Sequence, residues 1–310
     1  MAKLMEMLKT TKNVKPPRCL FYSTAGLGKT SLASEFPNPA FIFTEEGLPA
    51  DTEVFSFPLV QDSKTGDGQD IKGTGYDQFV DYLRMLGTEP HDRKTLVIDT
   101  IDKLEPMIIS KVCAENGWPD IEEPGYGKGY IAYKDKFADV LRMLNKLRTV
   151  RNMAIVILAH FDIKRFDEPG TEGYDRYVPR LHKKVVDLLV DDVDMVGFIN
   201  QKKVIKTQEG GFNKKHSHAE GHGTRVIYLE ERPGFVAKSR YKTPTEVVYH
   251  EAQGYKVLAD YFPGMDTPPT AIPEPVLTEE QEASAAVEAE QLADNGAPDT
   301  QSTTTETPAA

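Results

Sequence analysis

A short apolar run, CLFY at residues 19–22, leads into the segment STAGLGKT at residues 23–30, and a helical stretch follows. The segment fits the template G-x-x-x-x-G-K-[ST] at Gly28, Lys29 and Thr30, with Ser23 in the place of the first glycine. Glycine is needed because backbone N–H groups must curl around phosphate oxygens at dihedral angles that a side chain would obstruct. The pattern therefore predicts a phosphate-binding loop between a strand and a helix. The alternative is an ordinary glycine-containing turn with a surface lysine.

The chemistry of such a loop predicts ATP and magnesium as the bound groups. Lys29 would reach the β- and γ-phosphates, and the hydroxyl of Thr30 would join the magnesium shell. The helix that begins near Lys29 would direct the positive end of its dipole at the anion. The predicted nucleotide contacts are Ser23, Thr24, Ala25, Gly26, Leu27, Gly28, Lys29, Thr30 and Ser31.

Further apolar runs alternate with helical stretches along the chain. Several of these runs are apolar throughout, which is typical of strands buried on both faces. The clearest helical stretch is 131–148, where apolar residues recur at three- and four-residue spacing. We therefore expect an α/β fold with a mostly parallel twisted sheet flanked by helices, and antiparallel strands on its C-terminal side. The predicted strands are 19–22, 40–44, 95–99, 154–159, 194–199, 225–229 and 235–238.

The charge of the chain is concentrated at its C-terminal end. Residues 265–310 hold ten acidic residues and no Lys or Arg, which leaves −1 of the net charge of −11 for residues 1–264. The same segment is rich in Pro, Thr, Ala and Glu, so it cannot bury enough apolar surface to offset its ordering entropy. We predict a leader at 1–15, one α/β domain at 16–262 and an acidic disordered tail at 263–310.

The sequence predicts a cytoplasmic protein, or one in the host cytoplasm if a phage encodes it. No apolar run approaches the length of a membrane span, so no membrane partner is expected, and the N-terminus has no continuous apolar signal region. Cys19 and Cys113 are the only cysteines, and two reduced thiols are favoured over a single bridge.

Polar residues follow three of the predicted strands at the ends that should face a ligand. Asp99 ends the run LVID, 69 residues after Thr30, and is predicted to hold magnesium, with capping of the next helix as the alternative. Glu45 and Glu46 follow AFIFT, and either could orient the attacking water. His160 follows AIVILA and could contact the γ-phosphate or that water; an ordinary loop histidine is the alternative.

Three histidines, His216, His218 and His222, lie close together in KKHSHAEGHG. Their spacing could hold zinc, but no cysteine is nearby and the segment is glycine-rich. We favour a polar hairpin tip.

Six motifs together resemble the RecA-like recombinase ATPases, in particular the small phage nucleotide-binding proteins that act as single-strand annealing recombinases. The resemblance spans about residues 16–245. It rests on AGLGKTSLA at 25–33, FIFTEEGL at 41–48, LVIDTIDKLE at 96–105, GYGKGY at 125–130, VILAH at 156–160 and AKSRYKTP at 237–244. The resemblance implies a RecA-like P-loop core and ATP hydrolysis coupled to DNA recombination.

The resemblance also implies roles for single residues. It places the catalytic glutamate at Glu45, with Glu46 as the second choice, and the polar sensor at His160. It makes Lys238 and Arg240 candidates for a basic finger that reaches a neighbouring subunit's nucleotide. Their alternative is a solvated strand end. The expected partners are single-stranded DNA, further copies of this chain and a single-strand-binding protein.

The DNA-contacting loops of that family correspond here to the long segments 116–130 and 161–180. Both carry aromatic residues that could stack bases, although acidic residues in the same segments oppose a polyanion. The candidate phosphate contacts are Lys128, Lys164, Arg165 and Arg176.

Two other functions share the phosphate-binding loop. An AAA+ motor or helicase loader needs a helical lid after the core, whereas this chain continues with predicted strands. A DNA-interaction module could instead keep the nucleotide site for structural purposes alone.

Overall fold

The computed structural model describes residues 14–265 apart from 168–169, 171, 211–213 and 251, and it leaves out the side chains of residues 203–223. Nearly all of the predicted acidic tail, most of the predicted leader and the side chains of the three clustered histidines lie outside this description. In the part that is described, no helix is both long and apolar enough to cross a membrane. Cys19 and Cys113 are both buried and unpaired.

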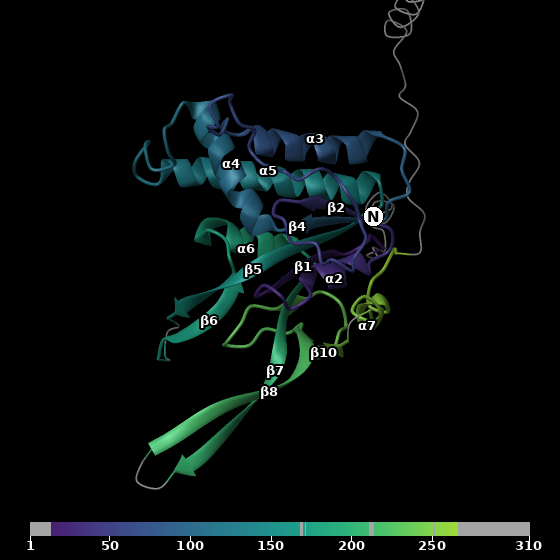
Figure 1. The fold of residues 1–310 in the computed structure, drawn as a ribbon, viewed down its shortest axis with the longest axis vertical. Helices are drawn as coiled ribbons and strands as arrows, with labels where there is room; N and C mark the ends of the chain where they lie inside the picture. The colour runs from purple at the N-terminus through teal and green to yellow at the C-terminus, as the bar shows by residue number, and fades with distance from the viewer. Residues whose placement is uncertain (1–13, 168–169, 171, 211–213, 251, 266–310) are drawn as a thin grey trace, which may run out of the picture. The chain divides into compact units, whose positions relative to one another are not determined.

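A sheet of ten strands forms the centre of the fold (Figure 1). Its main path runs β10-β8-β7-β1-β5-β4-β2-β3, with β6 paired to β5 and β9 paired to β7. Strands β1, β2, β3, β4, β5 and β7 pair in parallel, and β8, β9 and β10 join antiparallel, as the sequence predicts. The strands are β1 (Arg18–Ser23), β2 (Pro39–Phe43), β3 (Phe55–Ser56), β4 (Thr95–Asp99), β5 (Ala154–Phe166), β6 (Tyr174–Pro179), β7 (Met195–Gly210), β8 (Lys214–Tyr228), β9 (Lys238–Ser239) and β10 (Glu246–Tyr249).

Helices cover both faces of the sheet (Figure 1). One face packs against α3 (Thr74–Thr88), α4 (Ile101–Asn116), α5 (Lys128–Val150) and α6 (Lys183–Asp192). The other face packs against α2 (Lys29–Ser34) and α7 (Lys256–Ala259). This arrangement confirms the predicted α/β fold, a mostly parallel sheet between helices.

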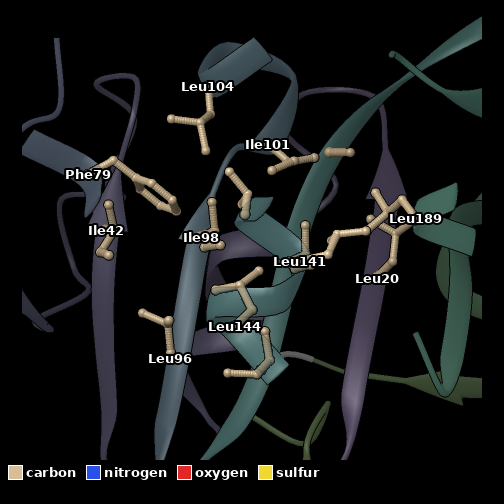
Figure 2. Packing of buried hydrophobic residues seen from close by; sticks show 14 of the residues in the cluster. Leu20, Ile42, Phe79, Leu96, Ile98, Ile101, Leu104, Leu141, Leu144 and Leu189 are labelled. Atoms are coloured by element: carbon tan, nitrogen blue, oxygen red, sulfur yellow. The ribbon is translucent and has the colours of Figure 1, made fainter. Parts of the chain in front are cut away.

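The central strands are buried on both sides because their residues alternate between two cores. In β4, Leu96 and Ile98 point into the core beneath α3, α4 and α5, while Val97 points into the core beneath α2. Figure 2 shows Leu141 and Leu144 of α5 packing over this first face, together with Ile98. Each such side chain is almost fully buried and contributes about 1.5–3 kcal/mol to the hydrophobic stabilisation.

The segment 161–180 was predicted as a long loop, and this prediction is wrong. Residues 161–166 extend β5 and pair antiparallel with β6, so the segment is a β-hairpin. Charged residues occupy both strands, with Lys164 opposite Arg176 and Arg165 opposite Asp175. An apolar pattern is a weak guide to such a strand, because only a few of its residues, such as Phe161 and Tyr177, pack against the core, and cross-strand pairing adds to its stability. Strands β7 and β8 likewise continue past their predicted ends as a paired arm (Figure 1).

Candidate nucleotide-binding and catalytic site

The predicted phosphate-binding loop joins the end of β1 to the start of α2. Gly28 caps α2 with φ +80°, a left-handed conformation that favours glycine. A Cβ atom at this position would also lie 2.8 Å from Nη1 of Arg225. Ser23 stands where the template has a glycine, but it is the last residue of β1, and its hydroxyl donates to the carbonyl of Thr24 at 2.7 Å. Serine is therefore accommodated without left-handed backbone.

Lys29 lies at the first position of α2 and is only 6% exposed. Its Nζ donates to the carbonyl of Thr24 at 3.1 Å and contacts Oγ of Ser23 at 3.4 Å. Burial lowers the pKa of Lys29, and the nearby carboxylates of Asp99, Asp102 and Glu45 oppose this shift. The charge of Lys29 is therefore not neutralised by a direct ion pair within the described residues, and it can attract the phosphate groups of a nucleotide.

Thr30 and Asp99 meet beside the loop. Oγ1 of Thr30 donates to Oδ2 of Asp99 at 2.7 Å. The strand of Asp99 is not the neighbour of β1, because β5 lies between β1 and β4. Burial raises the pKa of Asp99, whereas the hydrogen bond from Thr30 and the charge of Lys29 lower it. A hydroxyl and a carboxylate at this place form the oxygen donor set that magnesium prefers, so Thr30 and Asp99 fit the predicted metal.

Glu45 and Glu46 both face the same cavity after the end of β2, but only Glu45 is held by close contacts in the described residues. Oε1 of Glu45 accepts from Oγ1 of Thr100 at 3.2 Å, and its Oε2 lies 3.8 Å from Nζ of Lys103. Glu46 is exposed. A fixed carboxylate can orient a water better than a solvated one, so the geometry favours Glu45 as the water-orienting group. That role stays a prediction.

His160 lies in β5, opposite Ser23 of the phosphate-binding loop in the sheet register. It lines the cavity, and its contact with the γ-phosphate or the attacking water stays a prediction. Its Nδ1 is 3.0 Å from Oδ2 of Asp102, and its backbone N–H donates to Oδ1 of the same residue at 2.9 Å.

These residues enclose a cavity of about 230 Å³. This volume is below the roughly 300–1,000 Å³ of pockets that bury whole drug-sized ligands, and the phosphate-binding loop lines it, so we expect it to receive the phosphate chain. An apolar groove between α3 and α5 is slightly larger, about 260 Å³, but few polar groups line it. The phosphate-binding loop, Asp99 and His160 in its lining, and not its size, therefore locate the site. The cavity is lined by Ala25, Gly26, Gly28, Lys29, Thr30, Ser31, Glu45, Glu46, Gly47, Pro49, Asp99 and His160.

Sequence reasoning missed two residues that support the loop from the late strands. The hydroxyl of Tyr249 in β10 donates to the carbonyl of Leu27 at 3.2 Å, and the guanidinium of Arg225 in β8 lies against Gly28. Both residues are about 200 positions from the loop, and only the pairing of β7, β8 and β10 brings them there. No local sequence signal could have identified them.

The two predicted finger residues, Lys238 and Arg240, lie at the opposite edge of the sheet. Ser239 pairs with Met195 at the start of β7, whereas the phosphate-binding loop follows the end of the parallel strand β1. Nζ of Lys238 donates to the carbonyl of Val190 at 2.6 Å, and Nη1 of Arg240 contacts Oδ1 of Asp194 at 3.0 Å. Neither side chain approaches the cavity of its own chain, and a contact with a neighbour's nucleotide would have to replace these bonds.

The four candidate DNA contacts differ in how accessible their side chains are. Lys128 is exposed at the start of α5. Lys164 donates to the carbonyl of Leu181 at 3.0 Å, and Arg165 lies 3.5 Å from Asp167. Arg176 is buried, pairs with Glu231 and stacks over the ring of Phe166. Arg176 therefore stabilises the hairpin, and Lys128 and Arg165 are the more accessible cations.

The zinc site that the sequence disfavours, at the three clustered histidines, would involve side chains that are outside the described residues. Among the side chains that are described, no group of three or more His, Cys, Asp or Glu could hold a metal ion.

The chain matches a known protein family. The family described as AAA domain matches residues 15–241 of the 310. The matched range includes the phosphate-binding loop, Glu45, Asp99 and His160. No curated protein matches the sequence. The chain therefore belongs to the AAA domain family, and its fold is that of a P-loop nucleoside triphosphatase.

Proposed function

We propose that this protein hydrolyses ATP with magnesium to act on DNA, as a RecA-like recombination ATPase that binds single-stranded DNA and promotes annealing. The observation that carries the proposal is the path of β5. His160 of this strand lines the nucleotide cavity, and the strand then continues directly into the β5–β6 hairpin. His160 in the nucleotide cavity is thus only a few positions before Lys164 and Arg165, two candidate DNA contacts on the hairpin.

The residues of the cavity have separate roles in the proposed reaction. Magnesium, when bound, would neutralise charge on the phosphates. Lys29 would stabilise the negative charge that develops on the transferred phosphoryl group, because its cation already lies in the phosphate-binding loop, where it donates to the carbonyl of Thr24. Glu45 would orient the attacking water, and Asp99 and Thr30 would hold the metal. The basic finger formed by Lys238 and Arg240 of a neighbouring subunit, and a single-strand-binding protein as partner, stay predictions.

DNA binding is tested by removing two accessible cations, with Lys128→Ala and Arg165→Ala in one variant. Phosphate contacts dominate such binding and depend on salt, so the wild type is expected to bind single-stranded DNA more weakly as salt rises. DNA should also increase its ATP turnover. The double variant should bind several-fold more weakly, measured by fluorescence anisotropy with a labelled oligonucleotide.

The matched control removes two exposed cations from the middle of α5, Lys134→Ala and Arg142→Ala, and should bind DNA like the wild type. A wild type that shows no DNA binding at low salt, or equal losses in both double variants, would rule out this DNA surface.

A helicase loader or DNA motor is the second candidate function, because the family match is to an AAA domain. The two activities differ in product. An annealing protein pairs complementary single strands in the absence of a helicase, whereas a loader changes only the activity of its helicase. Annealing of two labelled complementary oligonucleotides by the purified protein therefore separates them.

A further inference from the structure

Asp102 makes two hydrogen bonds to one residue, His160. It lies in the first turn of α4, and its side chain is only 2% exposed. One carboxylate oxygen accepts the backbone N–H of His160 at 2.9 Å, and the other lies 3.0 Å from Nδ1 of the ring. Both the backbone and the ring of His160 are therefore tied to a single buried carboxylate.

An ionised carboxylate only accepts hydrogen bonds, so its ring partner must be a donor. Burial by itself would raise the pKa of Asp102, but the hydrogen bonds from the ring and the backbone of His160 outweigh this effect and the pKa is lowered. Asp102 is thus held in its ionised form. It follows that Nδ1 of His160 carries a proton, whether the ring is neutral or charged.

Nε2 is then the ring nitrogen that remains available to the nucleotide cavity. His160 lines that cavity, whereas Asp102 is not among the residues that do so. Glu45 is the other carboxylate near the ring, but its Oε1 is 3.7 Å from Nδ1, too far for a hydrogen bond. Glu45 is held instead by Thr100. Of these two carboxylates, only Asp102 is close enough to hydrogen-bond to His160 and so to orient its ring.

We propose that Asp102 is a positioning residue that fixes the ring of His160 with its proton on Nδ1 and presents Nε2 to the terminal phosphate. In the neutral ring, Nε2 accepts a hydrogen bond from the attacking water. In the charged ring, Nε2–H donates to a phosphate oxygen. The part of this inference that concerns hydrolysis rests on the proposed function, whereas the orientation of the ring does not.

The alternative is that Asp102 only stabilises α4, and this alternative predicts a different result. Acidic residues are favourable in the first turn of a helix because they interact with the helix dipole. If Asp102 acted only on the helix dipole, loss of its charge would lower the stability of the protein and leave the position of the proton on the ring of His160 unchanged. Asp77 in the first turn of α3 is a matched residue, since it is acidic and is exposed far from His160.

The test is Asp102→Asn, because asparagine keeps one acceptor oxygen and replaces the other with an NH₂ donor. If the remaining oxygen accepts the backbone N–H of His160, the NH₂ group faces Nδ1, which must then accept. The ring proton is expected to move to Nε2. The position of the proton is read from the ¹⁵N resonances of histidine-labelled full-length protein, with His160→Gln to assign the signal. ATP turnover should fall about 10- to 100-fold, the range found when the orienting partner of a metal-bound histidine is lost.

At a pH at which the ring is neutral, its proton is expected on Nδ1 in the wild type and in Asp77→Asn, and on Nε2 in Asp102→Asn. A wild-type ring protonated at Nε2 alone would overturn the inference without any variant. An unchanged proton position in Asp102→Asn would overturn it as well. An altered position with normal turnover would overturn the part that concerns hydrolysis. If Asp102→Asn moves the proton but the wild type shows no ATP turnover at all, the proposed function fails while the positioning of the ring by Asp102 is supported.

Discussion

Replacing Lys29 with alanine is expected to remove ATP hydrolysis and leave the fold intact. The loss should be about 10²- to 10³-fold or more, because the variant lacks the cation that stabilises charge on the transferred phosphoryl group. The fold should survive, because Lys29 makes no ion pair within 4.0 Å in the described residues and burial already disfavours its charged form. Phosphate release and thermal unfolding are the two measurements.

The control for this variant is Lys242→Ala, which removes an exposed lysine from the segment after β9. It should hydrolyse ATP at the wild-type rate. Near-normal turnover in a folded Lys29→Ala protein would contradict the assignment of residues 23–31 as the nucleotide-binding loop.

Replacing Glu45 with glutamine is expected to slow hydrolysis about 10²- to 10⁴-fold, the usual contribution of a positioned general base. Nucleotide binding should be retained, because glutamine preserves the shape of the side chain and the acceptor for Thr100 at 3.2 Å. Single-turnover phosphate release, together with calorimetric binding of an ATP analogue, separates the two effects.

Glu46→Gln is the matched variant, since Glu46 is the adjacent carboxylate and faces the same cavity. It should retain most of the activity, because its side chain is exposed and no contact within the described residues fixes it. The opposite order of the two activities would transfer the water-orienting role to Glu46.

The sheet could be predicted from the sequence because its central strands are buried on both faces. Runs such as LVID at 96–99 are apolar at nearly every position, and the structure divides their residues between the two cores. The β5–β6 hairpin could not be predicted in this way. Its strands carry charged residues on both sides of the pairing, so they lack the apolar pattern that marks a buried strand.

The cavity could be predicted as far as it is built from strand ends. Asp99 and His160 were found because each lies at the end of an apolar run, and parallel strands bring such ends to one edge of the sheet. Asp102, Arg225 and Tyr249 contact these residues or the loop from elsewhere in the chain. Their positions depend on the start of a helix and on the order of the last strands, which no local motif encodes.

The most direct test of a magnesium-dependent ATPase is phosphate release from ATP by the full-length protein, with Mg²⁺ and with EDTA, beside Asp99→Asn. The substitution would keep the size of the side chain but remove the charge that holds the metal beside Thr30. We predict release by the wild type only with Mg²⁺, and a loss of at least about 10²-fold in Asp99→Asn. Release that is equal in EDTA, unaffected by Asp99→Asn, or absent from the wild type under all conditions would contradict the account.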